Sequence, residues 1–150
     1  MTPISEADGF EYRSPEACQI VGVTYRKLDY WARTGLVKPS IRRADGSGSG
    51  RLWSFEDLVE LKLVESLVST GMTIGAIRDG LEAYRNEKYR TGTGLGIYLL
   101  ASSEHGWSAV QVDGIETGAL TVVTIVSIDW IRLVVEDSIF RYGRRSLAAV

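Results

Sequence analysis

The chain has 150 residues, of which 45% are hydrophobic and 24% are charged, and fractions this close to the globular average exclude a chain that is disordered or fibrous throughout. A single cysteine excludes an intramolecular disulfide. The first residues, MTPISEADGF, lack the basic and apolar regions of a secretory signal, and no segment has the ~20 apolar residues of a membrane-spanning helix, so we expect a cytoplasmic protein. The net charge of −2 counts against a nucleic-acid partner.

The charges are not spread evenly along the sequence. Residues 12–55 carry eight basic and three acidic residues, a net charge of +5, whereas residues 1–11 carry −3 and residues 56–90 and 91–150 carry −2 each. A polyanion would be attracted to the one basic segment. Taken alone, such a segment is better explained as a solvated basic face than as a binding site for a polyanion. The predicted local structure of the segment distinguishes these two interpretations.

Two short helices are predicted at the start of the basic segment. SPEACQIVG has a capping serine, Ser14, a proline at the first helical position and Gly22 as a left-handed C-cap. Thr24 offers a second N-cap, and the next helix runs on to Gly35. Two short helices joined by a glycine-containing turn of three or four residues are typical of a helix-turn-helix.

The second of these helices has two different faces. Its apolar side is predicted to pack inward and consists of Leu28, Trp31 and Ala32. Arg26, Tyr30 and Arg33 follow the spacing i, i+4, i+7 and share another face. A helix of this kind can enter the major groove of DNA with its N-terminal residues near base edges.

The sequence after Gly35 predicts a β-hairpin wing. In LVKPSIRRADGSGSGRLWSF, Pro39 ends any helix and ADGSGSG supplies a turn-prone tip between two short apolar arms. Arg42 and Arg43 precede the tip and Arg51 follows it, so a hairpin would gather three guanidinium groups near one end, where they could bind phosphates.

These residues resemble the MerR-type winged-helix transcription regulators. The family signature joins a recognition helix, T-x-R-x-L-x-Y-(Y/W), ending in T-G-L, to a wing and an R-x-(Y/W)-S-x-x-D-L start of the next helix. The matching positions are Thr24, Arg26, Leu28, Tyr30, Trp31, Thr34, Gly35, Leu36, Arg51, Trp53, Ser54, Asp57 and Leu58. The segment IVGVTYRKLDYWARTGLV is most similar to an actinobacterial subgroup.

The resemblance implies DNA contacts from the recognition helix, at Tyr25, Arg26 and Arg33, and from the arginines of the wing, with Trp53 bracing the wing base. With their polar and basic neighbours on the helix, the candidate DNA-binding residues are Thr24, Tyr25, Arg26, Lys27, Tyr30, Arg33, Arg42, Arg43 and Arg51. The implied partners are double-stranded DNA and a second copy of the chain, and RNA polymerase is a further candidate.

Two more helices complete a predicted domain over residues 12–90. Residues 55–70 carry two interleaved apolar rows with acidic residues in the first turn, where the helix dipole favours them, and Gly71 follows. Thr73 is predicted to cap a further helix with an apolar stripe of Ile74, Ile77, Leu81 and Tyr84. The domain is expected to be a winged helix-turn-helix of four helices and a hairpin.

The sequence departs from the family after Arg90. Family members continue into a long helix that pairs with the partner subunit, whereas here TGTGLG breaks the helix. Strands are predicted in LGIYLLA, WSAVQV and LTVVTIVSI, and Asp129 is predicted to cap a final helix that ends before Gly143. The expected fold class is α+β, with a small β-rich module at residues 95–142 and tails at residues 1–11 and 143–150.

Three roles are considered for residues 95–142. A module this small leaves sheet edges open, which favours self-association. The second interpretation is that residues 95–142 form an appendage that stabilises the winged helix. An effector-sensing domain is the least favoured, because the module is short and has no acidic and aromatic cluster suited to a cationic ligand.

Catalytic and metal chemistry are not expected. His105 is the only histidine and Cys18 the only cysteine, which leaves one candidate base for a Ser-His-Asp triad and too few ligands for a zinc cluster. His105 is predicted to be solvated and Cys18 to be a small core residue. GTGLG has no following lysine, so it is a poor phosphate loop. We therefore expect neither an enzyme nor a cofactor.

The leading interpretation is a sequence-specific transcription regulator that binds operator DNA as a dimer. An excisionase-like architectural protein, which uses the same winged helix to bend DNA, is the alternative. A protein-interaction module that has lost DNA binding is the third reading.

Overall fold

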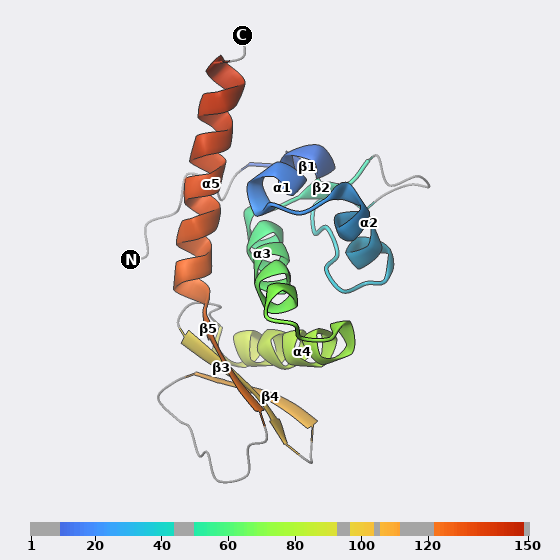
Figure 1. The fold of residues 1–150 in the computed structure, drawn as a ribbon, viewed down its shortest axis with the longest axis vertical. Helices are drawn as coiled ribbons and strands as arrows, with labels where there is room; N and C mark the ends of the chain where they lie inside the picture. Colours follow the sequence, from blue (N-terminus) through green and yellow to red (C-terminus); the bar gives the residue numbers. More distant parts are fainter. Residues whose placement is uncertain (1–9, 44–49, 93–96, 104–105, 112–121, 149–150) are drawn as a thin grey trace. The chain divides into compact units, whose positions relative to one another are not determined.

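The computed structural model describes residues 10–43, 50–92, 97–103, 106–111 and 122–148 (Figure 1). The chain divides into two compact units, the first made of residues 1–65 and 132–150 and the second of residues 66–131. The boundaries fall inside two helices, and each unit is described by itself.

The first unit begins with a two-stranded sheet whose first strand sequence patterning did not predict. β1 (Tyr12–Arg13) pairs antiparallel with β2 (Leu52–Trp53), so that Tyr12 lies opposite Trp53. A strand of two residues has no periodicity to detect. The ladder ties the start of the domain to the segment that follows residues 36–51, called the basic loop below.

Helix α1 (Ser14–Val21) starts at Ser14, the residue predicted to be its cap, and so one residue earlier than predicted. Arg13 is the N-cap, and its backbone N–H donates to the Glu16 carboxylate at 2.8 Å. The Ser14 hydroxyl, predicted to be the cap, instead accepts a hydrogen bond from the indole N–H of Trp53 at 3.1 Å. The strand pairing holds Arg13 extended and so moves the cap. Gly22 ends the helix with φ 83°, as predicted.

Helix α2 (Tyr25–Arg33) has the predicted N-cap. The hydroxyl of Thr24 accepts the backbone N–H of Lys27 at 3.3 Å. At the other end Gly35 has φ 75°, and the N–H of Leu36 donates to the carbonyl of Trp31 at 2.9 Å. The left-handed turn at Gly35 therefore ends the helix.

The basic loop closes through one antiparallel bridge between Arg42 and Leu52. The N–H of Arg42 donates to the Leu52 carbonyl at 3.2 Å, and the N–H of Leu52 donates back at 2.9 Å. The tip of the predicted hairpin lies outside the described residues. Leu52 thus bridges to Arg42 and is also part of the strand that pairs with β1.

Helix α3 (Phe55–Ser69) begins at a reciprocal cap. The N–H of Asp57 donates to the Ser54 hydroxyl at 3.1 Å, and the N–H of Ser54 donates to the Asp57 carboxylate at 2.8 Å. That carboxylate also accepts the backbone N–H and the hydroxyl of Ser40, both at 2.8 Å. The start of α3 therefore anchors the loop that follows α2.

The core of the first unit consists of apolar side chains from α1 to α3 and from the segments between them. Among the most deeply buried are Ala17, Leu28, Trp31, Leu36, Val37, Trp53, Phe55, Leu58 and Leu61. Cys18, predicted to be a small core residue, is half-buried, and burial raises the pKa of its thiol. The neutral thiol is therefore the favoured form.

In the second unit α4 (Ile74–Thr91) packs against a three-stranded antiparallel sheet (Figure 1). Thr73 caps α4 by accepting the N–H of Ala76 at 3.2 Å, and Gly92 ends it with φ 72°. The strands are β3 (Ile97–Ser103), β4 (Gly106–Gln111) and β5 (Val122–Ser127), in the order β4-β3-β5. Each overlaps a segment for which the sequence predicts a strand, but β3 ends two residues later than predicted, at Ser103, and β4 starts one residue earlier, at Gly106.

Helix α5 (Ile128–Ala148) differs from its prediction at both ends. The Ser127 hydroxyl, rather than Asp129, accepts the backbone N–H of Trp130, at 3.3 Å. The helix also continues through Gly143, where a tail was predicted for residues 143–150. Contacts between successive turns support the extension. Arg141 pairs with Asp137 at 2.9 Å, and Arg144 stacks 5.1 Å from the ring centre of Phe140.

Within the first unit, α5 contacts the start of α3 through Arg132. Its guanidinium group pairs with Glu56 and lies 4.9 Å from the ring centre of Phe55. His105 lies outside the described residues.

Candidate nucleic-acid interface

Helix α2 presents a polar face because its apolar residues are used by the core. Leu28 and Trp31 are buried, whereas Tyr25 is 46% and Tyr30 is 48% exposed. Arg26 is also exposed and lies one residue after Tyr25, in the first turn of the helix. Aromatic rings and a guanidinium group are therefore available to a ligand along the side of α2 that faces solvent.

Two of the predicted site residues support the helix itself. Thr24 uses its hydroxyl as the N-cap. Lys27 forms a long ion pair with Glu65 of α3, 3.7 Å between Nζ and Oε2. Both side chains remain exposed, so a structural contact and a ligand contact are compatible here.

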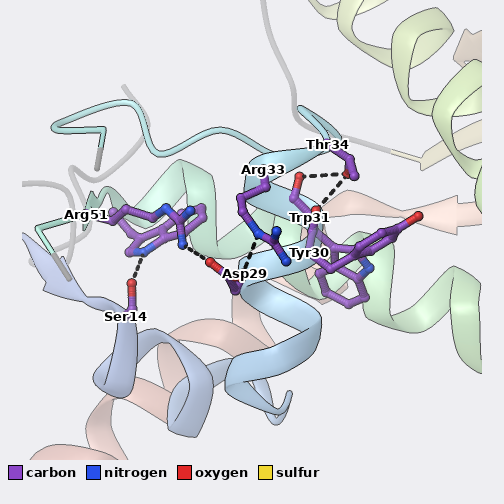
Figure 2. A network of polar contacts seen from close by, with 8 residues as sticks. Ser14, Asp29, Tyr30, Trp31, Arg33, Thr34 and Arg51 are labelled. Atoms are coloured by element: carbon purple, nitrogen blue, oxygen red, sulfur yellow. Dashed lines mark hydrogen bonds and ion pairs between the residues drawn. The ribbon is translucent and has the colours of Figure 1, made fainter. Parts of the chain in front are cut away.

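Asp29 joins α2 to Arg51, the residue just before β2. Its carboxylate accepts Nε of Arg33 and a terminal nitrogen of Arg51, each at 2.8 Å, and Figure 2 shows it between the two guanidinium groups. The hydrogen bond from Arg51 is the largest cause that lowers the pKa of Asp29, and the charge and the hydrogen bond of Arg33 lower it further. Together they outweigh desolvation, which raises this pKa. Asp29 is therefore ionised at neutral pH.

The two arginines bound by Asp29 are in very different surroundings. The side chain of Arg33 is 67% exposed, and its contact with Asp29 uses Nε. The side chain of Arg51 is only 6% exposed. Arg51, predicted to contact DNA from the wing, is a buried brace between the loop and α2.

Arg42 and Arg43 lie on the exposed arm of the basic loop. Nε of Arg42 donates to the carbonyl of Gly50 at 2.6 Å, which fixes its side chain across the loop next to the bridge to Leu52. Arg43 is exposed. These two arginines and the polar face of α2 thus belong to one unit and are joined by the bracing pair of Asp29 and Arg51.

Sequence reasoning missed two contributors to this surface. Asp29 was counted only as a negative charge, although its position four residues before Arg33 is the spacing of a helical ion pair. Lys38 was counted as a basic residue without a site, and the structure exposes it in the loop after α2. No sequence signal pointed to the partnership of Asp29 with Arg51, which are 22 residues apart.

Metal binding and membrane insertion are two further functions on which the described residues bear. Among the described residues, no group of three or more His, Cys, Asp or Glu side chains is placed to hold a metal ion. Within the same part of the chain, no helix has the length and apolar content needed to cross a membrane.

Comparison with known proteins gives a consistent family. Residues 12–84 match the model of the MerR HTH family of regulatory proteins. Three curated relatives, one from Mycobacterium bovis and two from strains of Mycobacterium tuberculosis, carry the name uncharacterised HTH-type transcriptional regulator. Each is 58% identical over 74 residues, which is 49% of this chain and 33% of the relative.

The matched region contains the caps of α2, α3 and α4 and the buried residues Leu28, Trp31 and Trp53. It also contains the exposed polar residues of α2, called the exposed row below: Tyr25, Arg26, Tyr30 and Arg33. The chain spans about a third of the length of the curated relatives that it matches. Residues 12–84 of this chain are a helix-turn-helix domain of the MerR family of regulatory proteins.

Proposed function

We propose that this protein is a transcription regulator that binds specific sites on double-stranded DNA. The observation that carries the proposal is the exposed row of Tyr25, Arg26, Tyr30 and Arg33 on a short helix whose opposite side is packed in the core. The names of the relatives, all HTH-type transcriptional regulators, agree with it.

In this proposal α2 is the recognition helix. A helix with a single polar face fits the major groove, and its N-terminal residues come nearest to base edges. Arg26 is the candidate for a base contact, since arginine can donate two hydrogen bonds to guanine. The neighbouring residues of the interface contact bases or phosphates beside it: Thr24, Tyr25, Lys27, Tyr30 and Arg33.

The basic loop acts as the wing. Arg42 and Arg43 bind phosphates beside the groove, which fixes the position of the protein but carries no sequence information. Arg51 is assigned a different role from the one that the family resemblance implies, because its side chain is buried against Asp29. It holds the loop at a fixed position relative to α2.

Self-association would place two recognition helices in successive major grooves, about 34 Å apart for half-sites one turn apart. Residues 95–142 are proposed to mediate it. Their helix α5 exposes Trp130, Leu133 and Phe140, which share one face.

The charges along α5 agree with an antiparallel pairing of two copies. The first half of the helix contains three acidic residues, Asp129, Glu136 and Asp137, and one basic residue, Arg132, and the last turns contain Arg141, Arg144 and Arg145. An antiparallel partner would set each acidic half against a basic half. Contact with RNA polymerase would then follow from the position of the bound dimer at a promoter.

The direct test is binding of the full chain to a labelled duplex, followed by fluorescence anisotropy over a series of KCl concentrations. The proposal expects a linear fall of the logarithm of the binding constant with the logarithm of salt, about 0.9 for each phosphate contacted. A chain that binds no duplex, or binds with no dependence on salt, is not a DNA-binding regulator.

A further inference from the structure

A pocket of about 320 Å³ opens between the end of α2 and the basic loop, and both of its walls belong to the first unit. Four of its lining side chains are cationic, Arg33, Lys38, Arg43 and Arg51, and Gly35 and Pro39 contribute to the wall between them. Its charge indicates an anionic ligand.

The four cations are not equivalent. Asp29 accepts hydrogen bonds from Arg33 and Arg51 and compensates about one of their two charges. Arg51 is buried and held in place by that contact. Arg33 is bound only through Nε in this pair, so its terminal nitrogens can donate to a second acceptor. Lys38 and Arg43 are exposed at the rim.

The side chain of Lys38 lies close to the backbone of Gly35 in the wall of the pocket. A Cβ atom at position 35 would lie 3.2 Å from Cε of Lys38, closer than an ordinary contact, and Gly35 has φ 75°. The lysine stem therefore lies against the bare backbone at the C-terminal end of α2. The same glycine that ends the helix thus also leaves room for this side chain.

We propose that this pocket binds one phosphate of the DNA backbone and that Lys38 is a phosphate-binding residue of the interface. The proposal rests on the proposed function and adds a contact to it. Arg33 and Arg43 offer planar pairs of donors, while Lys38 offers a compact charge, and both kinds of group bind phosphate oxygens. Arg51 is a positioning residue that acts through Asp29.

The same side chains could also bind a free phosphate ion. The position of the pocket favours a phosphate of the DNA backbone over a free ion. It lies between the helix and the loop that are proposed to contact adjacent parts of one duplex. On a bound duplex, a backbone phosphate would lie between the major groove that α2 enters and the phosphates that the wing contacts. Such a phosphate would enter the pocket from the side that α2 and the loop leave open.

The test compares Lys38→Gln with Lys88→Gln, which removes the same charge from α4. Duplex binding of the full chain is measured by anisotropy over a KCl series, with two duplexes of unrelated sequence. Loss of one phosphate contact should reduce the salt slope by about 1 and weaken binding by about five- to tenfold at 0.1 M KCl. Both duplexes should be affected equally, and Lys88→Gln should leave the slope unchanged.

The same proteins are titrated with inorganic phosphate and followed by calorimetry. If Lys38→Gln abolishes phosphate binding but keeps the wild-type salt slope on DNA, the pocket holds a free phosphate and the proposal is overturned. Equal slopes for the Lys38 and Lys88 variants, with no phosphate binding, overturn it as well. If the wild-type chain binds no duplex, the proposed function itself is overturned. The comparison of the Lys38 and Lys88 variants tests only the phosphate contact and does not overturn the proposed function.

Discussion

Arg51 shows how far a residue type can be interpreted without its surroundings. The sequence places it beside the loop tip, where three arginines suggest a phosphate-binding cluster, yet its side chain is buried and paired with Asp29. Arg26, by contrast, is exposed on α2 as its spacing predicts. Periodicity reports which face of a helix a residue shares, but pairing across 22 residues depends on the fold.

Substitution of Asp29 by asparagine should lower stability in a pH-dependent way. The pKa of Asp29 lies below its ordinary value of 3.8, chiefly because of the hydrogen bond from Arg51. The stability from the ionised group is therefore present above pH 3.8 and is lost as the pH falls through the lowered pKa. Thermal unfolding of both proteins from pH 7 to pH 2 should show a difference in Tm that shrinks on acidification.

Asp79→Asn on α4 serves as the matched control for this series. A difference in Tm between wild type and Asp29→Asn that grows as the pH falls would contradict the bracing role of Asp29.

Arg26 and Arg51 should give opposite phenotypes when each is replaced by alanine. Arg26→Ala should weaken DNA binding by about 1–3 kcal/mol and leave Tm unchanged, because the side chain is exposed and proposed to contact a base. Arg51→Ala should lower Tm, because it leaves Asp29 without its buried partner. Anisotropy and thermal unfolding measure the two effects. An Arg26 variant with wild-type affinity and sequence preference would remove Arg26 from the interface.

At the scale of the elements, caps and glycines made the helices predictable. Thr24 and Thr73 cap α2 and α4 as expected, and Gly22, Gly35 and Gly92 all have positive φ at helix ends. These signals are local, so the sequence contains them in full. Elements that depend on distant partners were harder to predict. Pairing of β1 with β2 moved the cap of α1 from Ser14 to Arg13.

The end of α5 was predicted too early for a similar reason. Gly143 has a low helix propensity, costing about 1 kcal/mol relative to alanine. The ion pair of Asp137 with Arg141 and the stacking of Arg144 on Phe140 span the turns before and after it. Single-residue propensity does not contain such pairs.

The N-cap of α2 can be tested without reference to DNA. Thr24→Ala should reduce the free energy of unfolding by about 1 kcal/mol, because the N–H of Lys27 loses its acceptor. Thr24→Ser keeps a hydroxyl and should retain most of the stability. Urea titration should show a lower midpoint for the alanine variant at an unchanged m-value. Equal midpoints for all three proteins would mean that the cap contributes nothing.

At the scale of the whole molecule, the distribution of charge matters more than its sum. The net charge of −2 argues against a polyanionic partner, yet residues 12–55 alone carry +5. The described part of that segment places most of its cations on α2 and on the basic loop. We expect weak, salt-sensitive binding to nonspecific DNA and tight binding only at the correct site.

Self-association is tested on the exposed face of α5. Phe140 is 61% exposed, so Phe140→Glu should not disturb the core but should oppose pairing of two apolar faces. Sedimentation velocity at micromolar concentrations should show a dimer for the wild type and a monomer for this variant. Ser138→Glu adds the same charge on another side of the helix and should remain dimeric. A Phe140→Glu variant as dimeric as wild type would exclude this face as the interface.

Sequence-specific regulation requires that the exposed row of α2 reads a DNA sequence. The most direct measurement is selection of bound fragments from a random duplex library by the full chain, followed by sequencing. Sequence reading by α2 predicts an enriched motif, with two half-sites about one helical turn apart if the protein binds as a dimer. Recovery of fragments without any shared motif would contradict it.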